Sequence, residues 1–136
     1  MVDHQLAARV LRMMKQRTQL LSNHQVLTGT DRLEERAPLR RGTKLNVPGI
    51  IVYLSGYTIT STSADNGEED AGAGFEASKN GETGPVWDVA ARLLGLQPRD
   101  QDLLFGHLLN NHATIAAFRQ LADGCNEVDW STILRN

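Results

Sequence analysis

Histidine and cysteine, which often serve as catalytic bases and nucleophiles, are few in this chain of 136 residues. His107 and His112 stand five positions apart, whereas the paired histidines of a metalloprotease helix stand four apart and face one metal. Cys125 has no histidine near it in the sequence to act as its base. We therefore expect a hydrogen-bonded structural role for His107, and an enzyme built around His107, His112 or Asp102 is the lowest-ranked hypothesis.

Acidic residues are concentrated in the stretch 61–84, which holds six of them and a single lysine. Carboxylates in loops can bind calcium, but aligning the EF-hand pattern on Gly67 puts Thr62 and Ala64 where acidic ligands are required. The glycine-rich segment 72–77 matches a relaxed dinucleotide-binding pattern, yet the acids before it would repel a pyrophosphate. We predict neither a metal nor a cofactor, with an irregular calcium site as the alternative.

The same stretch contains no Leu, Ile, Val or Met, so we expect an acidic, flexible, glycine-rich loop. Phe75 is its one large apolar side chain, and a lone aromatic often dominates an interface. Arg17 interrupts an apolar helical stripe, where a charge must snorkel, pair or meet a partner. These features suggest a small non-enzymatic interaction or regulatory protein that binds a protein partner or a second copy of itself. The expected contact residues are Phe75, Arg17, Glu68, Glu69 and Asp70.

Basic residues are concentrated near the start of the chain. Residues 1–44 hold nine Arg and Lys and four Asp and Glu, whereas residues 45–136 hold five and twelve. Such a division is typical of a segment that faces nucleic acid, or of two segments that face each other. The alternative hypothesis is therefore a nucleic-acid-binding protein, although residues 1–44 have no aromatic side chain on which bases could stack. Its expected contacts are Arg32, Arg36, Arg40, Arg41 and Lys44.

The elements that must position these residues follow from apolar periodicity. Apolar residues at helical spacing predict a long helix from Val2 to Ser22. A short basic helix should begin at Thr30 or Asp31 and end by Pro38. The segment 45–60, rich in β-branched and aromatic residues, predicts a β-hairpin that turns at Ser55 and Gly56.

The carboxyl-terminal part carries clear helix boundaries. Pro85 should open a helix and Gly95 close it. Pro98 should open a second helix, and Asn111 should begin a third that stops at Gly124. The segment 128–134 should then dock back onto these helices through Trp130, Ile133 and Leu134.

The predicted fold class is α+β: a small, mostly helical single domain with one β-hairpin, a long acidic loop and a carboxyl-terminal three-helix segment. Its parts are a basic helix plus hairpin (1–60), the loop (61–84) and a helical part (85–136). One cysteine excludes an intrachain disulfide framework, which favours a reducing compartment. The longest apolar run, 49–54, is far shorter than the roughly 20 residues of a membrane helix. We expect a cytoplasmic protein without a membrane partner.

Overall fold

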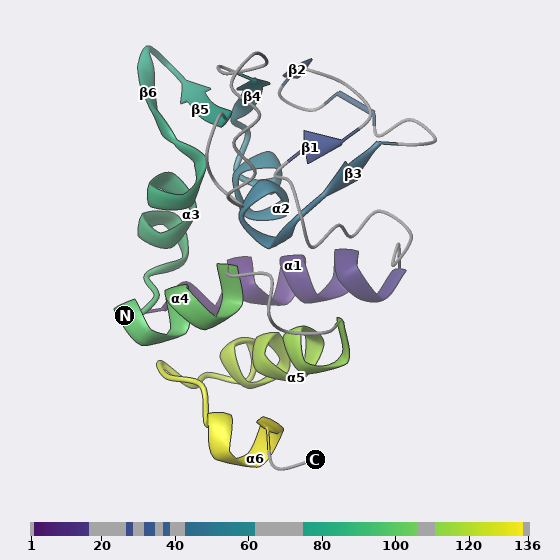
Figure 1. The fold of residues 1–136 in the computed structure, drawn as a ribbon, viewed down its shortest axis with the longest axis vertical. Helices are drawn as coiled ribbons and strands as arrows, with labels where there is room; N and C mark the ends of the chain where they lie inside the picture. Colours follow the sequence, from purple (N-terminus) through teal and green to yellow (C-terminus); the bar gives the residue numbers. More distant parts are fainter. Residues whose placement is uncertain are drawn as a thin grey trace.

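The computed structural model describes residues 2–16, 27–28, 32–34, 37–38, 43–61, 75–105 and 111–134. These residues form six helices and two antiparallel sheets, which confirms the α+β class (Figure 1). The helices are α1 (His4–Gln16), α2 (Val47–Leu54), α3 (Val86–Leu94), α4 (Pro98–Phe105), α5 (Asn111–Ala122) and α6 (Trp130–Leu134). The strands are β1 (Leu27–Thr28), β2 (Arg32–Leu33), β3 (Lys44–Leu45), β4 (Thr58–Ser61), β5 (Phe75–Lys79) and β6 (Glu82–Pro85).

The larger sheet has the strand order β2-β4-β5-β6 and covers one side of helices α2 and α3. Ile59 and Ala77 are register partners and are buried on the face that meets these helices. Because side chains alternate along a strand, Arg32, Glu76 and Thr83 project from the opposite, exposed face. The smaller sheet pairs β1 with β3.

Helix α1 runs through the middle of the molecule, with α2, α3 and the larger sheet on one side and α5 and α6 on the other (Figure 1). Its buried residues, Leu6, Ala7, Val10 and Met14, recur at one, three and four positions and form the apolar stripe expected from the sequence. The His4 Nδ1–H donates to the Leu121 carbonyl oxygen at 2.8 Å, which ties α1 to α5. Residues 17–22 of the predicted helix lie outside the described residues.

The predicted hairpin over residues 45–60 is wrong, because most of this segment is helix α2. The Asn46 side chain caps the helix by accepting a hydrogen bond from the Gly49 amide at 3.0 Å, and Pro48 stands in the first turn. All six residues from Val47 to Val52 are buried. A short apolar run buried on every side has no periodicity that separates helix from strand, so the cap and the packing decided the outcome.

The hairpin of this fold lies instead within the stretch expected to be a loop. Strands β5 and β6 are joined by Asn80 and Gly81, whose φ angles are 54° and 85°. Asn-Gly supplies the two left-handed residues of a tight hairpin turn, and the sequence reading overlooked this signal. The loop prediction is therefore wrong for residue 61, which ends β4, and for residues 75–84, whereas residues 62–74 lie outside the described residues.

The structure contradicts the predicted short basic helix and agrees with the predicted carboxyl-terminal helices. The predicted short basic helix is wrong at Arg32 and Leu33, which form strand β2 opposite Thr60 and Ile59. The carboxyl-terminal helices agree with the sequence: Gly95 ends α3 with a φ of 78°, and Pro98 begins α4. Trp130 is buried, as expected for a segment that docks back.

None of the helices in the described ranges is long and apolar enough to cross a lipid bilayer.

Candidate ligand-binding pocket

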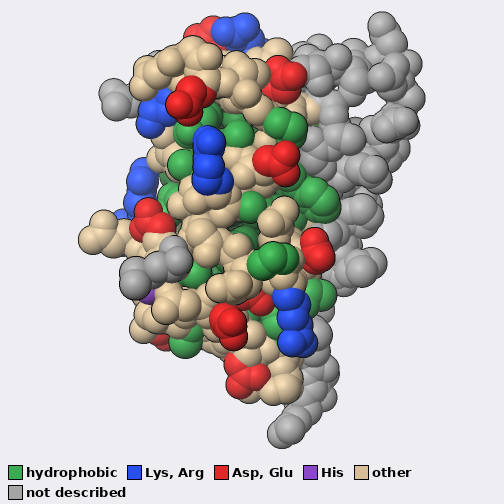
Figure 2. All heavy atoms as spheres, turned by 90° about the vertical axis from the view of Figure 1, so that its left-hand side faces the viewer, with side chains coloured by type: hydrophobic (Ala, Val, Ile, Leu, Met, Phe, Trp, Pro, Cys, Tyr) green, Lys and Arg blue, Asp and Glu red, His purple; other side chains and the backbone are tan. Residues whose placement is uncertain are grey.

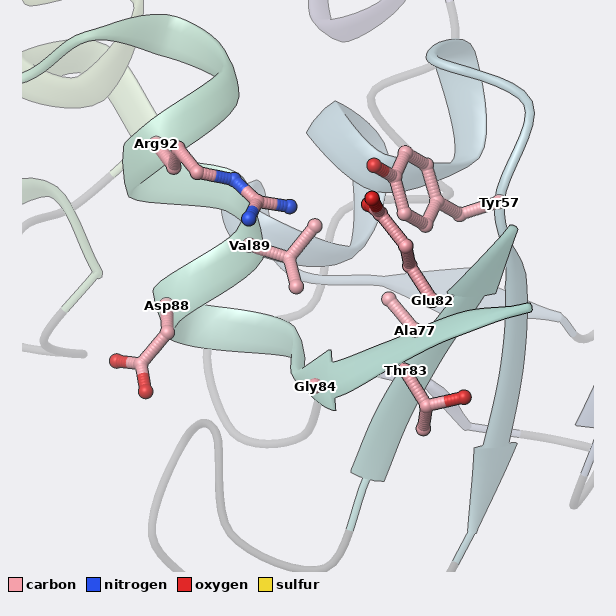
Figure 3. A pocket seen from close by; sticks show the side chains of 8 residues that line it. All are labelled: Tyr57, Ala77, Glu82, Thr83, Gly84, Asp88, Val89 and Arg92. Atoms are coloured by element: carbon pink, nitrogen blue, oxygen red, sulfur yellow. The ribbon is translucent and has the colours of Figure 1, made fainter. Parts of the chain in front are cut away.

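A pocket of about 400 Å³ lies between the β5–β6 hairpin and helix α3 (Figure 3). Its volume falls within the range of roughly 300–1,000 Å³ typical of sites for small ligands. Residues from β5, β6, α3 and the turn before β4 line it, so it depends on contacts between elements far apart in the sequence. The lining residues are Tyr57, Ala77, Glu82, Thr83, Gly84, Asp88, Val89 and Arg92.

The floor of the pocket is apolar and made of small side chains. Ala77 and Gly84 are opposite each other in the β5–β6 ladder, and Val89 of α3 packs beside them. A Cβ atom on Gly84 would stand only 3.3 Å from Cγ2 of Val89. Glycine at this position therefore lets α3 approach the hairpin closely.

Three polar side chains face one another across the pocket. Figure 3 shows the Arg92 guanidinium directed from α3 toward the Tyr57 hydroxyl and the Glu82 carboxylate, whereas Asp88 points away. Over the described ranges, neither Arg92 nor Glu82 has an ion-pair partner, and the Tyr57 hydroxyl has no hydrogen bond. Arg92 and Glu82 are exposed, so their charges are solvated.

Lys79 explains why Glu82 remains unpaired. The two residues are register partners beside the hairpin turn, yet the Lys79 ammonium donates to the Ser55 carbonyl oxygen at 2.9 Å. The same ammonium lies 5.5 Å from the centre of the Tyr57 ring, within reach of a cation–π interaction. Ser55 caps the carboxyl end of α2, where a cation is favoured. Lys79 thus holds Tyr57 in place and leaves the Glu82 carboxylate facing the pocket.

A second polar cluster is complete within the fold and serves to anchor α6. Asp100, only 3% exposed, accepts a hydrogen bond from Trp130 Nε1–H at 2.7 Å and another from the Val128 amide at 3.0 Å. Both carboxylate oxygens are therefore engaged. We assign this cluster to structure.

Of the five partner-binding residues expected from the sequence, the structure describes only Phe75. Phe75 begins β5, is half-buried and packs against the hydrophobic core. Arg17, Glu68, Glu69 and Asp70 lie outside the described residues. The proposed role of all five in an interface stays a prediction.

The basic residues expected to bind nucleic acid are described at two positions. Arg32 is exposed on β2, with its Nε 3.4 Å from Oε1 of Glu34, and Lys44 is exposed on β3 of the other sheet. Arg36, Arg40 and Arg41 lie outside the described residues. The face of the molecule in Figure 2 intersperses both signs of charge with hydrophobic side chains, and shows no region of a single sign among the described residues.

The residues weighed for catalysis do not come together in the described part of the chain. His112 is exposed near the start of α5, Asp102 is exposed on α4, and Cys125 is an exposed free thiol. His107 lies outside that part. The described residues contain no group of three or more His, Cys, Asp or Glu side chains close enough to hold a metal ion.

The sequence reading singled out none of the three polar residues that face the pocket. The Asn80-Gly81 turn could have aligned Lys79 with Glu82, because a two-residue turn fixes the register. Nothing in the sequence shows that α3 brings Arg92 to this hairpin.

No protein-family model, curated protein or solved structure matches this chain, so the function has to be inferred from the pocket itself.

Proposed function

We propose that this chain is a small binding protein whose binding site is the pocket between the β5–β6 hairpin and α3. The observation that supports the proposal is the convergence of Tyr57, Glu82 and Arg92 on one apolar-floored pocket without mutual pairing. Ligand sites typically combine an apolar lining with a few polar groups that fix orientation. Unpaired charges of opposite sign that face one another across a pocket can each bind an oppositely charged group of one ligand.

Two expectations from the sequence accompany this proposal. Binding of a protein partner or of a second copy stays a separate hypothesis, and Phe75 is the only one of its contact residues within the described residues. A cytoplasmic location also stays a proposal, supported by the exposed lone thiol of Cys125, which suits a reducing compartment.

The test is a fragment screen on the isotope-labelled full chain, observed by nuclear magnetic resonance. We expect saturable shifts of the Thr83, Gly84 and Val89 amides with charged fragments. Arg92→Ala should weaken those hits by about tenfold or more, because a charge-assisted hydrogen bond contributes roughly 1.5–3 kcal/mol.

The matched control is Arg99→Ala, which removes an exposed arginine on α4 that does not line the pocket. This variant should bind the same fragments as the wild type. Hits that map away from the pocket, or equal affinities of the Arg92→Ala variant and the wild type, would overturn the proposal.

A further inference from the structure

We propose that the pocket binds the zwitterionic head group of a free apolar α-amino acid. The inference rests on the proposed function and names the ligand class of that site. In this arrangement Arg92 binds the carboxylate of the ligand, Glu82 and Tyr57 bind its ammonium, and Val89 of the apolar floor receives its side chain.

Arg92 suits a carboxylate because its planar guanidinium can donate two parallel hydrogen bonds to the two oxygens. The nearest acid along its helix, Asp88, stands four residues earlier but points away from the pocket (Figure 3). Among the described residues no carboxylate lies within ion-pair distance of Arg92. The guanidinium is therefore available to an incoming anion.

Glu82 and Tyr57 suit an ammonium group, whose three N–H donors need acceptors. The Glu82 carboxylate supplies an anionic acceptor, and the Tyr57 hydroxyl beside it supplies a neutral one (Figure 3). Lys79 does not compete for this place, since its ammonium donates to the Ser55 carbonyl oxygen at 2.9 Å.

The relative positions of the polar and apolar groups match the shape of an amino acid. In Figure 3 the Glu82 carboxylate and the Tyr57 hydroxyl lie side by side, the Arg92 guanidinium faces them across a gap, and Val89 and Ala77 lie below them in the view. A ligand whose charges occupy that gap places its side chain against the apolar floor. Val89 is 6% exposed and Ala77 is 0% exposed, so the ligand side chain contacts Val89, while Ala77 belongs to the hydrophobic core.

The opposite charges also predict which molecules the pocket rejects. A ligand with a carboxylate alone would bring a second anion beside Glu82 and leave that residue without a partner. A ligand with an ammonium alone would do the same to Arg92. Mismatched charges at a partly desolvated site penalise the wrong ligand, so both kinds should bind more weakly than the zwitterion.

The experiment is calorimetric titration of the full chain with L-leucine and two derivatives that each lack one charge. Leucinamide lacks the carboxylate, and N-acetylleucine lacks the ammonium. We expect leucine to bind at least tenfold more tightly than either derivative. Leucyl-leucine carries its ammonium and its carboxylate on different residues, so it should bind more weakly than leucine, and tighter binding of the dipeptide would overturn the inference.

Substitutions of Arg92 and Glu82, one at a time, test which residue binds which charge of the ligand. Arg92→Ala should abolish the preference for leucine over leucinamide and keep the preference over N-acetylleucine, whereas Glu82→Gln should do the reverse. Both side chains are exposed, so the variants should fold, and their circular dichroism melts should match that of the wild type. Glu76→Gln, on the opposite face of the same sheet, is the matched control and should change neither preference.

The outcomes separate this inference from the proposed function. If fragments bind the pocket but leucine does not, or if N-acetylleucine binds as tightly as leucine, the zwitterion inference is wrong and the proposed function stands. If no fragment and no amino acid shifts the amides of Thr83, Gly84 or Val89, both are wrong.

Discussion

Asp100, Arg92 and Glu82 differ in whether the fold itself satisfies their polar atoms. Asp100 is buried and accepts hydrogen bonds on both carboxylate oxygens, so both oxygens are already paired within the fold. Arg92 and Glu82 carry full charges that no described residue neutralises. Since a buried polar group must be paired while a solvated one need not be, only the second kind is available to a ligand without a large cost to stability.

Replacing Asp100 by alanine should destabilise the protein strongly. The substitution leaves the Trp130 indole N–H and the Val128 amide buried without an acceptor, and we expect a loss of roughly 2–4 kcal/mol in the free energy of unfolding, measured by urea denaturation. Asp102→Ala, on an exposed position of the same helix, is the control and should change stability by less than about 0.5 kcal/mol. Equal effects of the two substitutions would contradict the assigned role of Asp100.

The two tryptophans offer a comparison of a satisfied and an unsatisfied donor. Trp130 Nε1–H donates to Asp100, whereas Trp87 Nε1–H is buried and has no acceptor among the described residues. Trp87→Phe removes a donor that was already unpaired, so it should cost less stability than Trp130→Phe, by about 1–2 kcal/mol. Urea denaturation of the two variants measures this difference, and a larger loss for Trp87→Phe would show that its ring contact with Phe105 dominates.

Secondary-structure elements were predictable where local chemistry fixed their ends. Gly95, Pro98 and Gly124 marked helix boundaries correctly, because a left-handed glycine or a proline acts on the backbone at its own position. The segment 47–54 was misjudged, since an apolar run buried on all sides favours helix or strand only through its packing. The pocket was not predictable at all, because no local signal places Arg92 of α3 against a hairpin and Tyr57.

The hairpin that carries Glu82 depends on the conformation of Gly81. Its φ of 85° disfavours any side chain, and no atom lies within 4 Å of the position where a Cβ would stand, so Gly81→Ala should cost about 1–2 kcal/mol through backbone strain alone. The variant should also bind pocket ligands more weakly, measured by calorimetry. Gly124→Ala carries a similar strain at a φ of 111° outside the pocket, and should lower stability without changing ligand affinity.

Helix α6 should respond to acid through its amino-terminal cap. Hydrogen bonds from the Ser131 hydroxyl at 2.6 Å and the Thr132 hydroxyl at 2.8 Å lower the pKa of the Asp129 carboxyl. A pKa that is lower in the folded state stabilises the fold above the unfolded value and loses that effect as the pH falls through the folded value. The docking of α6 should therefore weaken below about pH 4.

The measurement is Trp130 fluorescence against pH in a Trp87→Phe background. Asp129→Asn should make the signal flatter in this acidic range, because it removes the titrating carboxyl while keeping a side chain of the same shape. A pH profile unchanged by Asp129→Asn would assign the transition to another carboxyl group.

The whole molecule is organised around α1, which contacts α2 and α3 on one side and α5 on the other (Figure 1). The buried hydrophobic residues of all these elements form one continuous cluster. Backbone contacts extend the connection, since the Asp3 amide donates to the Leu94 carbonyl oxygen at 2.8 Å while His4 bonds to Leu121 of α5. A shared central helix should make the two sides unfold as one cooperative unit.

Val10→Ala tests whether the two sides of α1 unfold as one cooperative unit, because Val10 is fully buried in α1. The lost contacts and the cavity should lower the free energy of unfolding by roughly 1–3 kcal/mol. Trp87 on α3 and Trp130 on α6 report the two sides separately in single-tryptophan backgrounds made by Trp130→Phe and Trp87→Phe. In each background Val10→Ala should lower the urea midpoint by the same amount, since both sides lose the same buried partner. A shift seen by only one tryptophan would mean that α1 belongs to that side alone, and that the pocket is carried by a unit which folds without the carboxyl-terminal helices.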